Sequence, residues 1–189
     1  MHLVVGLGNP GRSYECTRHN LGWMVLEQAA DRWNIALVKQ EHGFLGQGDV
    51  KGHPVLLLLP LTWMNQTGVV VRAVLQDLSP VTPDLIVVHD DLDLSLGTIK
   101  IKTRGGAGGH NGLRSVLSCV GTEEFSRVKF GIGRPQNNED LANFVLSPFP
   151  EEEWKQIVST LPKAIDALEC LICEGPDAGM NRFNVRSSD

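Results

Sequence analysis

A histidine and an aspartate in this sequence have the chemistry of an acid–base pair. His19 comes just before an apolar, helix-like segment, and Asp90 follows the apolar run 85–88. A carboxylate beside an imidazole fixes the tautomer of the ring and stabilises the imidazolium that forms when the ring takes a proton. The two residues therefore predict a general base with its orienting partner. A lone histidine is also a common helix cap, and an aspartate at this place can simply begin a polar turn.

Three asparagines and a glycine-rich segment supply neutral hydrogen-bonding groups. Asn9 lies in an Asn-Pro-Gly turn, and Asn65 follows an apolar run. Asn111 lies in the glycine-rich segment 105–112, whose backbone can approach a ligand closely and present N–H groups to it. Such groups suit hydrogen bonding to peptide groups better than phosphoryl transfer. Taken singly, Asn65 and Asn111 also fit the role of helix caps.

The sequence offers no nucleophile for a covalent acyl intermediate. It contains no Gly-x-Ser-x-Gly motif, and none of its cysteines stands beside His19. Water activated by His19 is therefore the expected attacking group. A metal-dependent hydrolase that uses His19, Asp90 and His110 stays open as an alternative. Because the spacing of these residues fits no standard ligand motif, we expect neither a metal nor another cofactor.

The N-terminal glycines have the spacing of a dinucleotide-binding fingerprint but not its structural context. Residues 6–11 read Gly-x-Gly-x-x-Gly after a predicted strand. In that fingerprint a helix begins at the second glycine and directs its N-terminus at a pyrophosphate. Here Pro10 restrains Asn9 to an extended conformation, and the helical pattern begins only near Asn20. The context therefore argues against a dinucleotide site.

The elements that must position these groups alternate between strands and helices. Short apolar runs predict strands, and longer stretches with a 3.6-residue apolar period predict helices. The expected strands are 3–6, 44–50, 55–59, 85–89, 98–102 and 128–132, and the expected helices are 20–33, 66–78, 112–120 and 151–173.

This alternation predicts an α/β fold with a single domain over residues 1–189. We expect three layers, in which helices flank a twisted, mixed and largely parallel sheet. The carboxyl ends of parallel strands converge at one edge of a sheet. Asn9, Asn65 and Asp90 should therefore meet the glycine-rich segment in one crevice, because each of them follows a predicted strand.

The composition is that of an ordinary globular protein. The chain has 189 residues, a formal net charge of −5, 42% hydrophobic and 21% charged residues. These values exclude a disordered chain and a uniformly basic nucleic-acid binder. No apolar run approaches the roughly 18 residues of a membrane span, the N-terminus lacks a signal-peptide pattern, and four scattered cysteines form no disulfide framework. We therefore expect a soluble, cytoplasmic protein with reduced, structural cysteines and no membrane association.

Positive charge is confined to one part of the chain. Residues 98–134 hold seven Lys or Arg residues and two acids, whereas the rest of the chain is acidic. Such a segment suggests a patch that meets phosphate, although a solvated charged face is the commoner explanation for a run of this kind.

Six blocks of residues and Tyr14, in order along nearly the whole chain, match one known family. The blocks are 5–11, 17–22, 62–68, 89–93, 105–112 and 130–135. Through them the sequence resembles the bacterial-type peptidyl-tRNA hydrolases. The resemblance implies a monomeric, metal-independent enzyme of the cytoplasm that cleaves the ester of its partner, peptidyl-tRNA, and so recycles tRNA from aborted translation. A non-catalytic RNA-binding relative is a further alternative, since plant chloroplast splicing factors also resemble this family.

The same resemblance implies roles for individual residues. His19 is the general base, Asp90 is its partner, and Asn9 distinguishes blocked from free aminoacyl-tRNA. A hydrophobic lid around residues 140–149 is a further implication. Trp63 stands where phenylalanine is commonest in the family, and Lys129 stands where arginine is common, so both depart from its pattern. The residues expected to contact substrate are Tyr14, Trp63, Met64, Asn65, His110 and Asn111, and those expected to contact tRNA phosphates are Lys102, Arg127 and Lys129.

Overall fold

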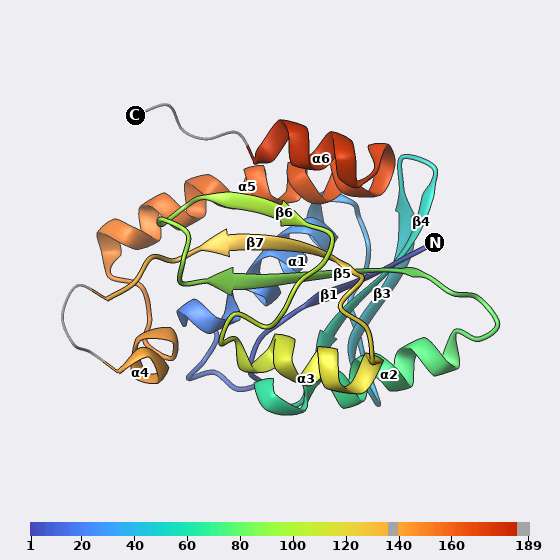
Figure 1. Ribbon diagram of the computed structural model, residues 1–189, viewed down its shortest axis with the longest axis horizontal. Helices are drawn as coiled ribbons and strands as arrows, with labels where there is room; N and C mark the ends of the chain where they lie inside the picture. Colours follow the sequence, from blue (N-terminus) through green and yellow to red (C-terminus); the bar gives the residue numbers. More distant parts are fainter. Residues whose placement is uncertain (136–139, 185–189) are drawn as a thin grey trace.

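A seven-stranded β-sheet forms the middle layer of the molecule. The computed structural model describes residues 1–135 and 140–184. The strands lie in the order β2-β3-β4-β1-β5-β7-β6, and helices cover both faces (Figure 1). The strands are β1 (His2–Gly6), β2 (Val38–Gln40), β3 (Gly43–Val50), β4 (His53–Pro60), β5 (Asp84–Asp91), β6 (Ile99–Lys102) and β7 (Ser126–Gly131). The helices are α1 (Leu21–Arg32), α2 (Thr67–Asp77), α3 (Asn111–Val120), α4 (Leu141–Val145), α5 (Glu151–Glu174) and α6 (Pro176–Phe183), with 3₁₀ turns η1 (Arg18–Asn20) and η2 (Met64–Gln66).

The four central strands β4, β1, β5 and β7 run parallel to one another. Strands β1 and β5 are buried over most of their length, because each is a run of apolar residues with helices on both faces. The outer pairs β3–β4, β2–β3 and β6–β7 are antiparallel. This mixed sheet with a parallel centre and helices on both sides confirms the predicted fold class.

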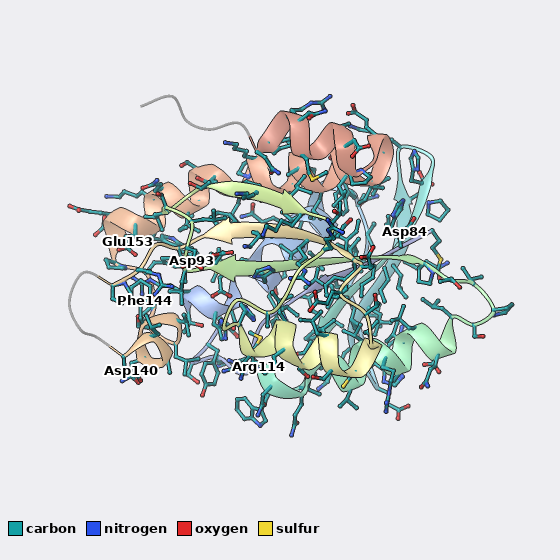
Figure 2. The ribbon with its side chains drawn as sticks, in the orientation of Figure 1. Asp84, Asp93, Arg114, Asp140, Phe144 and Glu153 are labelled. Carbon is teal, nitrogen blue, oxygen red and sulfur yellow. The ribbon has the colours of Figure 1, made fainter. Side chains whose placement is uncertain are left out.

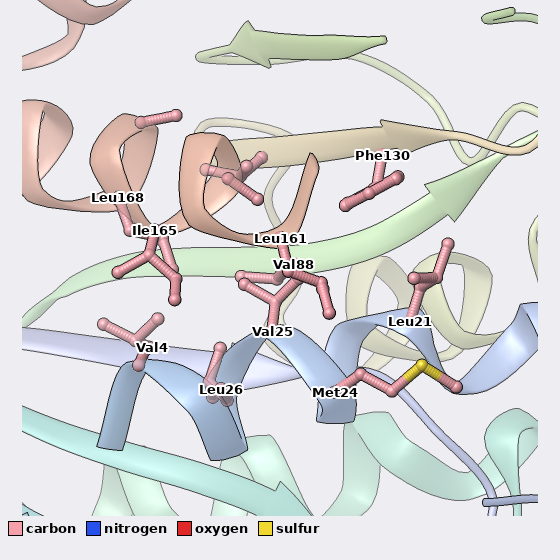
Figure 3. Close-up of a cluster of buried hydrophobic side chains, with 14 of the residues drawn as sticks. Val4, Leu21, Met24, Val25, Leu26, Val88, Phe130, Leu161, Ile165 and Leu168 are labelled. Atoms are coloured by element: carbon pink, nitrogen blue, oxygen red, sulfur yellow. The ribbon is translucent and has the colours of Figure 1, made fainter. Parts of the chain in front are cut away.

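Alternate residues of the central strands face two separate helical layers. Val4 and Val88 pack with Ile165 in the cluster formed with α1 and α5 (Figure 3). Val5 and Val87 belong to the cluster formed with α2 and α3. This follows from the two-residue period of a strand, which sends successive side chains to opposite faces. Because both faces are covered, the loops that follow the strands are left to build a site at the carboxyl ends of the strands.

Three short elements were not predicted from the sequence. Strand β2 is an exposed three-residue edge strand, and α4 has only five residues, which is less than two helical turns. Helix α6 does carry a local signal, since Gly175 has a positive φ of 88° and Pro176 is the first helical residue. Among the described residues, no helix is both long and apolar enough to cross a bilayer.

The direction of β6 corrects the expected route of the glycine-rich segment. The sequence places that segment after a strand whose carboxyl end joins those of β1, β4 and β5. However, β6 is antiparallel to β7, with Ile99 beside Phe130 and Lys102 beside Arg127. Strand β6 therefore ends beside the amino end of β7, away from the carboxyl ends of β1, β4 and β5. The glycine-rich segment runs back across the molecule from there to reach α3 (Figure 1).

Candidate active site

Helix α1 places His19 at the carboxyl ends of β1 and β5. The helix lies directly on the backbone there, because a Cβ atom on Gly22 would come within 2.4 Å of both Leu7 N and Val88 O. Only glycine permits so close an approach. The η1 turn before the helix thereby brings His19 against Asp90, a residue 71 positions away in the chain.

Two histidines share the carboxylate of Asp90. The Oδ1 atom lies 3.0 Å from His19 Nδ1 and 3.0 Å from His110 Nε2, and Asp90 is 3% exposed. A carboxylate only accepts hydrogen bonds, so both of these ring nitrogens carry a proton. In the neutral ring of His19, Nε2 is then unprotonated, and it is the nitrogen that can take a proton from water.

The start of helix α3 locks His110 in one tautomer. Its Nδ1 accepts hydrogen bonds from the backbone N–H groups of Gly112, at 3.1 Å, and Leu113, at 3.3 Å. The proton of the neutral ring is therefore on Nε2, which donates it to Asp90. Both ring nitrogens are engaged within the protein. The ring caps a helix and orients Asp90, and it also lines a cavity beside His19, so its contact with substrate stays a prediction.

The same geometry counts against a metal site. His19, Asp90 and His110 bring three potential ligand atoms within 4.8 Å of one another. A ligating histidine must offer a lone pair at the nitrogen that binds the metal. Nε2 of His110 holds a proton as long as its Nδ1 accepts from helix α3. The donor set therefore fits a hydrogen-bonded triad better than it fits a cation.

Burial and charge act in opposite directions on the pKa values of this triad. Burial lowers the pKa of His19, but the charge and hydrogen bond of Asp90 outweigh it, and the pKa is raised above its ordinary value. Burial also favours a neutral Asp90, yet the two histidines hold the pKa of its carboxyl well below the usual range. Burial dominates at His110 and keeps its pKa below the ordinary value. The result is a charged carboxylate between a basic and a neutral imidazole.

The loop after β1 holds Asn9 in a fixed orientation. Its backbone N–H donates to Asn20 Oδ1 at 2.8 Å, and its carbonyl accepts from Asn20 Nδ2 at 2.9 Å. Its side-chain Oδ1 accepts from the backbone N–H of Met64 at 2.8 Å. Among the described residues, its Nδ2 group makes no protein hydrogen bond, so Asn9 presents an amide donor to the cleft.

The predicted substrate-contact residues other than His110 line one cleft, together with Asn9 and His19. The cleft measures about 320 Å³, and Tyr14 meets the half-exposed Trp63 edge to face at its rim. Helix α4 supplies an apolar wall on the other side. The lining residues are Asn9, Tyr14, His19, Trp63, Met64, Asn65, Asn111, Ala142, Val145 and Leu146.

A second cavity of about 350 Å³ adjoins the cleft beneath the glycine-rich segment. The two hollows share His19, Asn111, Ala142 and Val145, so they open onto the same histidine. Open space therefore lies beside His19 in both hollows, and the second hollow is also lined by His110, Arg127 and Lys129.

The three expected phosphate contacts have different surroundings. Lys102 is exposed on β6. Lys129 forms an ion pair with Asp91, which leaves its charge partly neutralised. Arg127 is 3% exposed, and its guanidinium donates to the carbonyls of the glycine-rich segment at Gly105 and Gly106. This side chain therefore braces the segment from inside, and it also lines the cavity beneath that segment, so its contact with a phosphate stays a prediction.

Several residues of the site were missed in the sequence. His89 lies next to Asp90 and is buried, with Nδ1 2.6 Å from the Asp90 carbonyl oxygen, and burial holds its pKa well below the ordinary value. Asn20 and Arg18 flank His19, and they bind the Asn9 loop and the segment before α5. Their position in the sequence on either side of His19 was the signal that could have marked them as residues of the site. The wall formed by α4 lies within residues 140–149, where the family resemblance implied a hydrophobic lid, but no local pattern predicted a helix there.

Comparisons with known proteins agree with this geometry. A family model described as peptidyl-tRNA hydrolase matches residues 3–189. A Bacillus subtilis protein named peptidyl-tRNA hydrolase is 43% identical over 187 residues, which cover 98% of this chain and 100% of that protein. A Lachnospira eligens protein of the same name is 40% identical over 185 residues, covering 97% of this chain and 100% of the relative. The crystal structure of peptidyl-tRNA hydrolase from Acinetobacter baumannii superimposes with a TM-score of 0.91 at 37% identity, over 98% of this chain and 95% of that one. The chain belongs to the peptidyl-tRNA hydrolase family.

Proposed function

We propose that the chain hydrolyses peptidyl-tRNA, cleaving the ester between a peptide, or another N-blocked aminoacyl group, and the 3′-terminal adenosine of tRNA. The observation that carries this proposal is the His19–Asp90 pair beside a cleft lined by asparagine amides. Such a set activates water and binds carbonyl groups without a covalent nucleophile. The named activity of the relatives supports the same substrate.

His19 acts as the general base in this mechanism. Its Nε2 takes a proton from water as the water oxygen attacks the ester carbonyl carbon, and Asp90 stabilises the imidazolium. The tetrahedral intermediate then collapses, and the bond between the carbonyl carbon and the ribose oxygen breaks. The proton on Nε2 passes to that oxygen, which restores the neutral ring and releases free tRNA.

The amides bind the acyl part of the substrate. Because Oδ1 of Asn9 is occupied by Met64, its Nδ2 group is the part offered to a ligand. In an N-blocked aminoacyl group, the carbonyl of the blocking group can accept a hydrogen bond from this donor. A free aminoacyl group has an α-ammonium in that place, which cannot accept one. An unpaired donor lowers affinity, so Asn9 selects blocked substrates. Asn65 and Asn111 line the same cleft and supply further amides to the carbonyl groups.

The direct test uses N-acetyl-aminoacyl-tRNA and free aminoacyl-tRNA in a buffer with EDTA. We expect release from the blocked substrate, with little from the free one, because neither water activation nor carbonyl binding uses a metal. Release that disappears in EDTA and returns with a divalent cation would show a metal-dependent hydrolase. Binding without any release, in either buffer, would show an RNA-binding relative.

We further propose that the enzyme works as a cytoplasmic monomer without a cofactor.

Replacing Lys102 by alanine is expected to weaken tRNA binding without slowing hydrolysis of a minimal substrate that lacks the tRNA body. One lost phosphate contact reduces the slope of log Kd against log salt by roughly 0.7–0.9. The measurement is a salt titration of tRNA binding. Lys163→Ala, on the exposed side of α5, is the matched control and should keep the wild-type slope. An unchanged slope in Lys102→Ala would remove this residue from the tRNA surface.

A further inference from the structure

Three consecutive side chains of the η1 turn anchor three different parts of the site. His19 bonds to Asp90 on β5, and Asn20 pairs with both backbone groups of Asn9. Arg18 bonds to the segment that joins α4 to α5. The turn therefore holds the base, the Asn9 loop and the α4 region in one frame.

Arg18 is bound on almost every side. It is 4% exposed, and its Nη1 atom donates to Ser147 Oγ at 2.6 Å and to the Pro148 carbonyl at 2.9 Å. Its Nη2 atom pairs with Glu153 at 2.6 Å, and the guanidinium lies 4.2 Å from the centre of the Phe144 ring. Phe144 and Glu153 lie at the same end of the molecule in Figure 2. A buried cation requires partners of this kind to offset its desolvation, so their loss is costly. Of the three guanidinium nitrogens, Nε lacks a partner among the described residues.

Helix α4 depends on such a contact for its position. With five residues it is too short to be stable alone. Phe144 is its buried residue and is the one that lies against Arg18. On the other side of the helix, Ala142 and Val145 line both hollows beside His19, and Leu146 lines the cleft. Arg18, the neighbour of His19 in the sequence, therefore contacts the helix that forms the opposite wall of the cleft.

We propose that Arg18 is a positioning residue, which holds the apolar α4 wall at a set distance from the His19 ring so that the acyl group fits between them. This inference rests on the proposed function. A wall that contacts substrate equally before and during the reaction contributes to KM and leaves kcat unchanged. The His19–Asp90 hydrogen bond does not involve Arg18, so the pH dependence of the reaction stays as in the wild type.

The test compares Arg18→Met with Arg32→Met. Arg32 also joins α1 to α5, through Asp166 at 2.8 Å and Glu169 at 3.4 Å, but it lines neither hollow beside His19. For N-acetyl-aminoacyl-tRNA we expect Arg18→Met to raise KM roughly 10-fold with kcat within about 2-fold of the wild type, as for loss of one apolar contact. Amide exchange of residues 140–149 should also become about 10-fold faster. Arg32→Met should change neither KM nor the amide exchange rate of residues 140–149.

Ser147→Ala keeps the test valid if Arg18→Met does not fold. It removes the short hydrogen bond from Arg18 and the bond that Ser147 Oγ donates to the Phe144 carbonyl, and it leaves the ion pair with Glu153. KM should therefore rise roughly 3-fold. A fall in kcat at unchanged KM, or an exchange rate for residues 140–149 like that of the wild type, would overturn the positioning role. Amide exchange needs no substrate, so a wild-type protein that hydrolyses nothing would refute the proposed function and leave this readout interpretable.

Discussion

Replacing His19 by alanine is expected to lower kcat for N-acetyl-aminoacyl-tRNA by about 1,000-fold, the usual contribution of a positioned general base. Neither of the other two imidazoles of the site can replace it. Both nitrogens of His110 are engaged by Asp90 and helix α3. Nε2 of His89 has no partner among the described residues, but this side chain is buried, lines the second cavity and not the cleft, and has a pKa well below the ordinary value because of its burial. The amides of the cleft remain in the variant. Substrate binding, measured as KM, should therefore change much less than kcat.

The measurement is steady-state release of the blocked aminoacyl group, with amide exchange or circular dichroism to show that the variant is folded. His42→Ala is the matched control, because His42 pairs with Asp77 at 2.9 Å on the surface and lines no cleft beside His19. It should retain the wild-type kcat. A His19→Ala variant with more than about a tenth of the wild-type kcat would exclude His19 as the base.

Replacing Asp90 by asparagine is expected to have the second largest effect, with two separate signatures. The maximal rate should fall by about 100-fold or more, because the imidazolium loses its charged partner. The acid limb of the pH profile should also move. In the wild type only neutral His19 is active, so kcat/KM falls as the pH drops through the pKa of His19, which Asp90 holds above 6.5. Without the charge of Asp90, burial lowers the pKa of His19, and the midpoint of the acid limb of kcat/KM moves to lower pH.

Asp84→Asn is the matched control for this profile. Asp84 begins the strand that ends near Asp90, but its side chain is 81% exposed and lies at the other end of the molecule from Asp93 (Figure 2). It should leave both the rate and the midpoint unchanged. Because the pKa of Asp90 lies well below the usual range, its own titration does not contribute to the limb. A midpoint that stays in place or rises in Asp90→Asn would show that Asp90 does not set the basicity of His19.

The sequence alone determined the fold class and most of the cleft. The apolar periods of β1, β4 and β5 are local properties, and they placed Asn9, Asn65 and Asp90 at the carboxyl ends of strands that proved to be parallel. His19 was identified for the same reason, since its helix follows the first strand. Periodicity predicts such positions because burial on one face or both repeats along the chain.

Only the tertiary structure decided which partners these residues meet. The antiparallel direction of β6, the burial of Arg127 under the glycine-rich segment and the α4 wall held by Arg18 all depend on contacts between distant segments. The role of His110 as the cap of α3 and as a donor to Asp90 likewise became visible only in the hydrogen bonds of its two nitrogens. Hydrogen-bond geometry and desolvation are properties of neighbours in space, and local sequence patterns do not encode them.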